Sequence, residues 1–232
     1  MKTLCRRPIS LQKRRMKIPF LIRLLLFFFL VTGLIHSINA GEPDYLSPLE
    51  KAIVREINLA RTNPKSYASF LEEWKRYYDR KLLKIPGETI IMTKEGVTAL
   101  NEAIGLTHSM NPVPRLNPSR GMSRGARDHV KDQGSSGSSQ HKGSDGSQPW
   151  DRVNRYGTWE KSIAENISYG SDKARNMVIG LIVDDGVPSR GHRKNIFNPD
   201  FRVIGVACGP HPTYRTVCVI TFAGGYKEES RK

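Results

Sequence analysis

The sequence lacks the short motifs that mark several large classes of enzyme. Its 232 residues contain no GxSxG nucleophile elbow and no HExxH metal-binding helix. No segment resembles an RNA- or DNA-reading motif. These absences leave no catalytic nucleophile identified, and they give specific nucleic-acid binding no support.

Cysteine is also scarce, and the positions of the cysteines are informative. The chain has three, and only Cys208 and Cys218 lie after residue 40. Each falls in a β-branched segment, and the "GPHPTYRTV" stretch between them is typical of a turn. Cysteines on facing strands of a hairpin can form a disulfide in an oxidising compartment. A metal-binding pair is the alternative, although the spacing is far from CxxC.

Acidic residues are absent from the first 40 residues, which carry eight basic ones. The basic stretch precedes "LLLFFFLVTGLI" and the small residue Ala40, a pattern typical of a secretory signal peptide. We therefore expect residues 1–40 to be removed and the protein to be extracellular, with an uncleaved membrane anchor as the alternative. Removal lowers the formal net charge from +15 to +7, because eight basic residues and no acidic one are lost. Such a surface favours anionic membranes or glycans as partners.

Cap signals and apolar periodicity predict helices in the rest of the chain. A capping box from Ser47 to Glu50 opens a helix that continues to about residue 60. Asn63 and Asn117, each followed by a proline, are possible caps of two further helices. Residues 94–106 predict another helix.

The second half of the chain alternates between polar and apolar segments. The polar "DQGSSGSSQ" stretch predicts a mobile loop, and "SIAENISYG" predicts a short strand. Residues 171–186 place apolar side chains on one face at helical spacing, and Gly186 is a natural stop for that helix.

The helix predicted after Asn117 has two different faces. His129 lies with apolar residues on one face, where a hydrogen-bonded core histidine is expected. The other face carries a basic stripe of Arg120, Arg124, Arg127 and Lys131. This stripe is either a solvated helix face or a contact for anionic lipid or glycan.

Three motifs in order give the sequence a family resemblance. "HKGSDGSQPWDRV", "AENISYG" and "GHRKNIFNPDFRVIGVACG" follow "INLAR", and together they resemble the CAP superfamily of cysteine-rich secretory, antigen-five and pathogenesis-related proteins, also called SCP domains. The resemblance covers most of residues 47–225. It implies an α+β fold, a three-layer α-β-α sandwich with a mostly antiparallel central sheet. Residues 41–232 then form a single domain with an insertion around 79–114.

The resemblance also implies a central cleft lined by two histidines and two acidic residues. His141 and His192 match the histidines, and Glu165 matches the acid of the "EN" motif. Asp184 is the fourth residue, three positions after Leu181, which replaces a tryptophan found in many members; Asp185 is its rival. Two imidazoles with carboxylates suit zinc or another divalent metal. The same groups can instead form charge-assisted hydrogen bonds that brace the fold.

The resemblance favours a secreted binding module without catalytic activity. Its ligand would be a lipid, a sterol, a peptide or a divalent metal held in the cleft by His141, Glu165, Asp184 and His192. A metal-dependent or histidine-assisted hydrolase of extracellular esters or peptides is one alternative. A purely structural extracellular domain is another. The sequence sets no oligomeric state.

Overall fold

The computed structural model describes residues 43–229, so the predicted signal peptide lies outside the described residues. No helix within this range is long and apolar enough to span a bilayer. The elements follow one another as α2 (Pro48–Thr62), α3 (Pro64–Trp74), β1 (Tyr78–Asp79), β2 (Leu82–Leu83), β3 (Ile91–Met92), α4 (Val97–Ser109), β4 (Asn117–Pro118), α5 (Arg120–Ser136), α6 (Pro149–Asn154), β5 (Gly157–Tyr169), α7 (Ala174–Val183), α8 (Gly191–Phe197), β6 (Val203–His211) and β7 (Arg215–Glu228).

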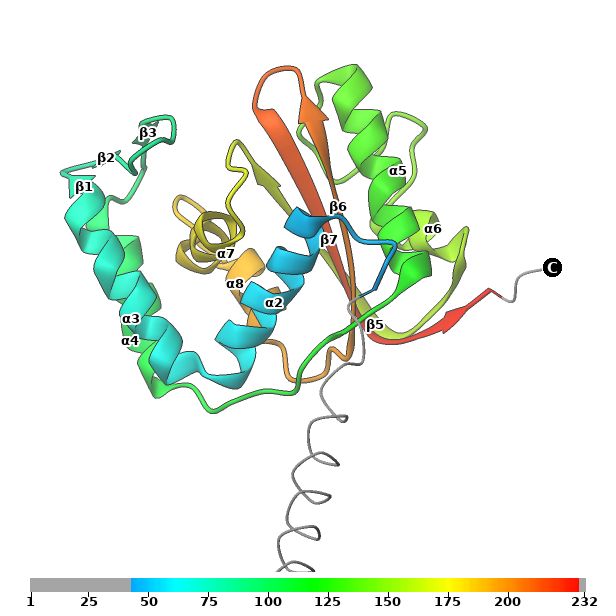
Figure 1. Cartoon of the computed structure of the whole chain (residues 1–232), viewed down its shortest axis with the longest axis horizontal. Helices are drawn as coiled ribbons and strands as arrows, with labels where there is room; N and C mark the ends of the chain where they lie inside the picture. The colour runs from blue at the N-terminus through cyan, green and yellow to red at the C-terminus, as the bar shows by residue number, and fades with distance from the viewer. Residues whose placement is uncertain (1–42, 230–232) are drawn as a thin grey trace, which may run out of the picture. The chain divides into compact units, whose positions relative to one another are not determined.

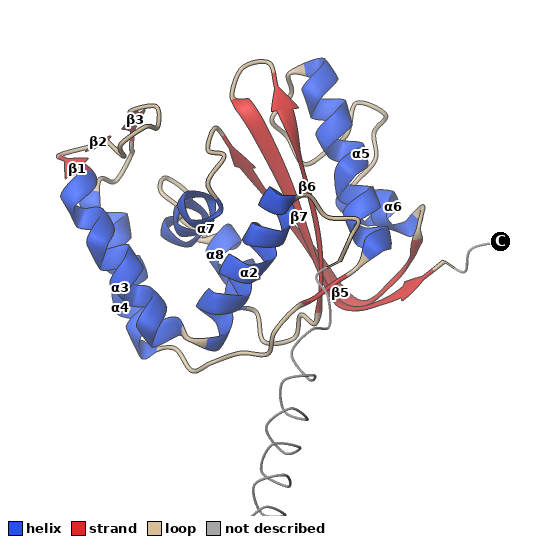
Figure 2. Ribbon diagram, viewed as in Figure 1, coloured by secondary structure: helices blue, strands red, loops and turns tan. Residues whose placement is uncertain are grey.

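The larger sheet has the strand order β4-β6-β7-β5. Strands β5 and β6 both pair antiparallel with β7, whereas the two-residue β4 pairs parallel with β6. Helices α5 and α6 lie on one side of this sheet, and α2, α7 and α8 lie on the other (Figure 1 and Figure 2). The structure thus confirms the predicted α+β class, with a mostly antiparallel sheet between two helical layers.

The central strands are apolar on both faces because helices cover both. Val206 of β6 and Val219, Ile220 and Phe222 of β7 are almost fully buried. A strand buried on both faces reads as a nearly continuous apolar run rather than as an alternating one. The segments "VIGVAC" and "TVCVITFA" have this pattern.

The disulfide prediction is confirmed by the register of the hairpin. Cys208 of β6 lies directly opposite Cys218 of β7, and the two sulfur atoms are bonded at 2.07 Å. Facing positions of an antiparallel pair bring two side chains within bonding reach. The alternative, a metal-binding pair, is therefore wrong.

Helix starts agree with the cap signals at one position and differ at two. Ser47 and Glu50 form the expected capping box of α2. Asn63 makes no side-chain cap bond to α3, which nonetheless begins at the adjacent proline. Ser119, not Asn117, caps α5, because Asn117 pairs with Val203 as part of β4.

Helix α5 is longer, and α7 shorter, than the sequence pattern predicted. Residues 132–136 of the predicted Gly/Ser loop continue α5, which ends at the left-handed Gly137. Helix α7 ends at Val183, and Asp184 rather than Gly186 takes the left-handed position that closes it. Strand β5 has 13 residues, so it is not the short strand expected.

The predicted insertion packs onto the main core. It contains the small sheet β1-β2-β3 and helix α4, which begins at Val97, three residues later than predicted. Ala99, Leu100 and Ala103 of α4 are fully buried and belong to the same apolar cluster as the inner face of α2.

One buried arginine joins three parts of the chain. Arg61 of α2 is 0% exposed, and its guanidinium donates hydrogen bonds of 2.5–3.2 Å to the carbonyls of Pro114, Ile196, Asn198 and Phe201. Burial lowers the pKa of Arg61 to about 10. The side chain ties α2 to the segment before β4 and to the connection between α8 and β6.

Candidate functional site

The four side chains of the expected cleft lie in two histidine–carboxylate pairs. His141, in the connection between α5 and α6, has its Nδ1 atom 2.9 Å from Oε1 of Glu165 in β5. His192 of α8 has its Nδ1 atom 2.6 Å from Oδ1 of Asp184, which directly follows α7. The carboxylates are 1% and 2% exposed, whereas the His141 and His192 side chains are 52% and 27% exposed. Each pair is a buried anion beneath an accessible imidazole.

A buried arginine balances the charge of Glu165. Nη2 of Arg152, in α6, donates to Oε2 of Glu165 at 2.8 Å, and both side chains are nearly inaccessible. The guanidinium also donates to the carbonyls of His141 and Ser147. Arg152 therefore fixes the Glu165 carboxylate and the backbone of His141 at the same time.

Asp184 is held by backbone groups rather than by a buried cation. Its Oδ2 atom accepts a hydrogen bond from the His192 backbone N–H at 2.9 Å. Its φ of 56° is in the left-handed region, which Asp adopts more readily than most residues with a side chain. This conformation ends α7 and directs the chain toward α8, which carries His192.

The two pairs meet neighbouring residues of strand β5. Glu165 binds His141, and the adjacent Asn166 donates its amide to the His192 carbonyl at 3.0 Å. Asn195 of α8 in turn donates to the Asn166 side-chain oxygen at 2.8 Å. Successive side chains of a strand point to opposite faces. Because β5 is an edge strand of the sheet, the two pairs approach this edge from the two helical layers, one from α5/α6 and the other from α8.

The insertion supports the segment that carries Asp184 and His192. Asp185, the rival candidate, accepts hydrogen bonds from the backbone N–H groups of Lys94 and Glu95 at 2.6 and 2.8 Å. The Glu95 carboxylate accepts from the Gly186 backbone at 2.7 Å. Asp185 therefore belongs to the contact with the insertion, and Asp184 is the aspartate that binds a histidine.

Two arginines extend this contact to α4. Arg190 donates to the carboxylates of Glu95 and Glu102, and Arg193 donates to Glu102 at 2.6 Å. Hydrogen bonding from Arg190 and from the Gly186 backbone lowers the pKa of Glu95 to about 2. Arg193 also donates to the carbonyls of Ile182 and Val183 at the end of α7.

His129 is the hydrogen-bonded core histidine that the helix pattern predicted. It is fully buried, and its Nε2 atom lies 2.8 Å from the Gln140 carbonyl, one residue before His141. Burial lowers the pKa of His129 below its ordinary value, so the ring is neutral near pH 7. Its Nδ1 atom and the Nε atom of Arg152 have no hydrogen-bond partner in the described part of the chain.

The four side chains are not arranged as ligands of a single metal ion within the described residues. Within residues 43–229, no group of three or more His, Cys, Asp and Glu side chains is placed to hold a metal ion. Both carboxylates are engaged by Arg152 or by backbone N–H groups. Zinc binding remains a prediction, and a measurement of metal content tests it.

Sequence reasoning missed the polar residues that hold the pairs. Arg152 stands within the "PWDRV" motif, and the sequence signal for it was indirect, since a buried carboxylate such as Glu165 requires a cation or several donors. No sequence pattern around Asn195 indicates that it supports the site. Its partner Asn166 is 29 residues away, and only the fold brings them together.

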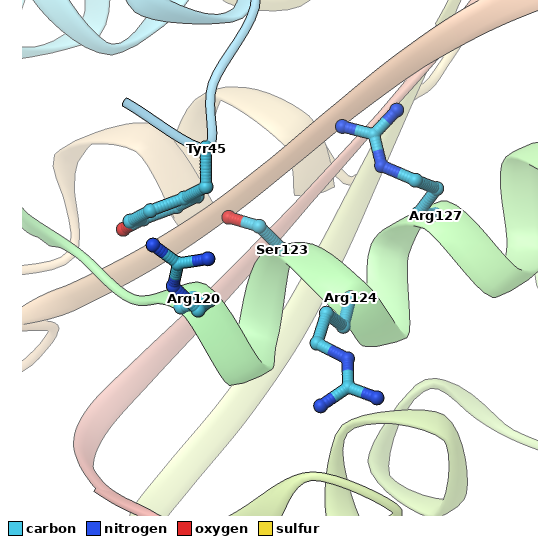
Figure 3. A pocket seen from close by; sticks show the side chains of 5 residues that line it. All are labelled: Tyr45, Arg120, Ser123, Arg124 and Arg127. Atoms are coloured by element: carbon cyan, nitrogen blue, oxygen red, sulfur yellow. The ribbon is translucent and has the colours of Figure 1, made fainter. Parts of the chain in front are cut away.

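The three arginines of the basic stripe of α5 line a pocket of about 230 Å³ together with Tyr45 and Ser123. Figure 3 shows the Arg120 guanidinium beside the Tyr45 ring, with Arg124 and Arg127 farther along the helix. Arg120 pairs with Asp44, and Arg127 pairs with the buried Glu50 at 2.6 Å. Much of the stripe's charge is therefore neutralised within the fold. Contact with lipid or glycan remains a prediction.

The solved structures compared with the chain are distant. An outer surface protein from Borrelia burgdorferi shares 18% identity, with a TM-score of 0.41 over 50% of this chain and 80% of that one. An extracellular protein containing an SCP domain from Bacillus anthracis shares 23% identity, with a TM-score of 0.39 over 48% of this chain and 34% of that one. A cysteine-rich secretory protein from Staphylococcus aureus shares 14% identity, with a TM-score of 0.35 over 48% and 32%. The match spans about a third of the length of the last two proteins.

Membership of a family rests on a sequence match. No curated protein matches the chain. The family model "CAP: Cysteine-rich secretory protein family" matches residues 54–222, which is more than half of the sequence and includes both histidine–carboxylate pairs. The chain therefore belongs to the CAP family of cysteine-rich secretory proteins.

Proposed function

We propose that the protein is a secreted, non-catalytic binding module whose ligand contacts the imidazoles of His141 and His192. The observation that carries this proposal is the geometry of the two pairs. A buried carboxylate holds each ring through Nδ1, and neither Nε2 atom has a hydrogen-bond partner among the described residues. Two fixed, accessible rings offer a ligand polar contacts with little ordering cost.

Secretion is supported by the family and by the disulfide. The matching family is described as secretory, and Cys208–Cys218 is of the kind that persists outside the reducing cytosol. Retention by an uncleaved N-terminal anchor is the alternative. Cleavage of the N-terminal segment and its retention as an anchor would both place the domain in the extracellular compartment.

The ligand class we propose is a small organic molecule, a lipid, a sterol or a peptide, ahead of a metal ion. Metal ligands must present free lone pairs, and the carboxylates of Glu165 and Asp184 already accept charge-assisted or backbone hydrogen bonds. The Nε2 atoms of His141 and His192 are then the groups left to meet a carbonyl, a hydroxyl or a carboxylate. Zinc, if bound, would use these nitrogens and would serve to polarise a bound oxygen.

A histidine-assisted hydrolase is the second candidate, and one observation favours it. A carboxylate that receives Nδ1–H orients an imidazole as a general base, and Glu165 and Asp184 are both placed to do so. The ring could then accept a proton from water at Nε2. No hydroxyl or thiol of the described residues bonds to either ring, so water is the nucleophile of this alternative.

The test compares the wild-type chain with His141→Ala/His192→Ala. The probes are a fluorescent sterol, a fatty acid, a peptide library and Zn²⁺, with an activated ester and casein as hydrolase substrates. His108→Ala is the matched control, because His108 also pairs with a glutamate, Glu72, but at an exposed position. We expect one of the organic probes to bind, with about tenfold or greater loss of affinity in the double variant and none in the control.

Three outcomes contradict the proposal, each in a different way. Turnover of the ester or casein that disappears in the double variant identifies a hydrolase. Metal content in the wild type that the variant lacks identifies a metal site. A fall in thermal stability without any change in binding identifies the tetrad as a structural brace only.

A further inference from the structure

The insertion exposes three consecutive large apolar side chains. Ile90, Ile91 and Met92 are 58%, 52% and 69% exposed, and we refer to them as the apolar tip. Both residues of β3 are exposed, so this strand lacks the buried face that strands normally have. Single exposed apolar residues are ordinary on protein surfaces, but a contiguous group marks an interaction site.

The apolar tip is held in place by the small sheet, which is anchored in the main core. β3 is an end strand of the small sheet, and its pairing partner β2 includes Leu83, which is buried in the main core. Thr93, next to the tip, donates both its backbone N–H and its hydroxyl to the Lys81 carbonyl. In Figure 1 and Figure 2 the small sheet lies at the end of α3 and α4, away from the central sheet. The tip is thus presented by the fold at an extremity of the described domain.

Exposed basic residues flank the apolar tip: Lys94 lies two residues after Met92, and Arg80 and Lys81 directly precede Leu82, the pairing partner of Met92. All three are exposed, and none forms an ion pair with a carboxylate among the described residues. The acids of the insertion are engaged elsewhere: Asp79 pairs with Lys84 and Glu88 accepts from Ser171 and Asn176. Glu95 and Glu102 both pair with Arg190. The charge available to a partner at this end of the domain is therefore cationic.

We propose that the apolar tip inserts into an anionic lipid surface while Arg80, Lys81 and Lys94 contact the lipid headgroups. Apolar side chains gain by entering the acyl boundary, and each nearby Lys or Arg adds attraction to an anionic leaflet. A lipid surface needs no complementary groove, which suits an exposed apolar group with basic residues beside it. This inference is independent of the histidine–carboxylate pairs and of any ligand that they bind.

The test uses a probe at the tip itself, because the N-terminal segment of the full chain could bring the protein to a membrane by another route. Ile91→Cys is labelled with the fluorophore NBD in a Cys5→Ser background, in which Cys208 and Cys218 stay in their disulfide. Ser139→Cys, at an exposed position in the connection after α5, carries the same label as a control. The vesicles are phosphatidylcholine alone or phosphatidylcholine with phosphatidylglycerol at 7:3.

We expect the label at position 91 to become brighter and blue-shifted on the anionic vesicles only. A nitroxide on the lipid acyl chain should quench it, and the control label should not respond. Arg80→Glu/Lys81→Glu should abolish the shift, and so should 1 M salt, which shortens the Debye length from about 10 Å at 0.1 M to about 3 Å. Ile90→Ser/Met92→Ser should weaken the shift without unfolding the domain, because both side chains are exposed.

Several results would overturn the inference. One is that the labelled chain binds no vesicle, and another is that the chain floats with vesicles while position 91 stays in water. An equal shift on neutral vesicles removes the role of the cations. A shift that occurs without lipid and grows with protein concentration shows instead that a second copy of the chain covers the tip.

Discussion

The two histidine–carboxylate pairs look alike in composition but differ in what holds them. Glu165 sits in a strand, and its charge is balanced by Arg152, which is as deeply buried as the carboxylate. Asp184 sits at a helix end, where the His192 backbone N–H supplies its further hydrogen bond. His141 is also about twice as exposed as His192. One pair is thus built on a buried ion pair, and the other on backbone geometry.

This difference shows why neither pair can be described by its histidine and acid alone. The His141–Glu165 pair depends on α6, which supplies Arg152. The His192–Asp184 pair depends on the insertion, through Glu95 and Glu102, which bind Arg190 and the neighbouring backbone. Variants that remove one support at a time distinguish the two kinds, from the largest expected effect to the smallest.

Removing Arg152 should have the largest effect. Arg152→Met leaves the Glu165 carboxylate buried without its cation, and this should lower the free energy of unfolding by about 3–5 kcal/mol. Arg152→Met combined with Glu165→Gln should recover a large part of the loss, since no uncompensated charge remains. Urea denaturation measures both variants. A loss below about 1 kcal/mol in the single variant would mean that the ion pair does not support the first pair.

Removing the Asp184 carboxylate should come second. Asp184→Ala leaves the His192 backbone N–H and ring without their acceptor, at a cost of about 2–3 kcal/mol. Asp184→Asn should recover part of it, because Asn accepts hydrogen bonds and tolerates the left-handed backbone. Asp185→Ala is the control and should cost less. Equal losses for the two alanine variants in urea would contradict the distinct role of Asp184.

Weakening the insertion contact should have a smaller and more local effect. Glu102 is about half exposed, so Glu102→Gln should cost less than about 1 kcal/mol. Its NMR signature should be clearer: the ring signals of His192 should move, and those of His141 should not. Movement of both sets would show that the two pairs share one support.

The pH dependence of His129 should be the smallest effect. Because burial lowers its pKa, the folded protein keeps the ring neutral at pH values where the unfolded chain already binds a proton. Its contribution to the free energy of unfolding is therefore full above about pH 6.5 and is lost as the pH falls through the folded-state pKa. His129→Gln should flatten this acid loss in urea titrations at successive pH values. An unchanged slope would show that other groups cause it.

Local signals in the sequence predicted local features well. The Ser47–Glu50 capping box lies within one helical turn, and the Cys208–Cys218 bridge lies within one hairpin. The prediction of the layered fold rested on the resemblance of the motifs to a family, and hydrophobic periodicity alone did not supply it. The cap at Ser119 was missed because a strand pairing with residue 203 removes Asn117 from the helix.

The supports of the site could not be predicted, because they depend on distant residues. Arg152 and Glu165 are 13 residues apart, and Arg190 and Glu95 are 95 residues apart. In the sequence each of these charged residues is typical of a solvent-exposed side chain, and only the fold brings the members of each pair together. Which charges are buried is a property of the packed layers, and the sequence pattern of any one element does not contain it.

The strand order has a consequence for how the domain can be made. Strand β7 ends at Glu228, late in the chain, yet it lies between β5 and β6 and supplies the only antiparallel partner of each among the described strands. During synthesis β5 and β6 therefore stay without their antiparallel partner until β7 has also been made, and this sheet can assemble only then. Until that point the apolar faces of β5 and β6 have no strand to pair with, so the formation of the sheet is a late, non-local step of folding.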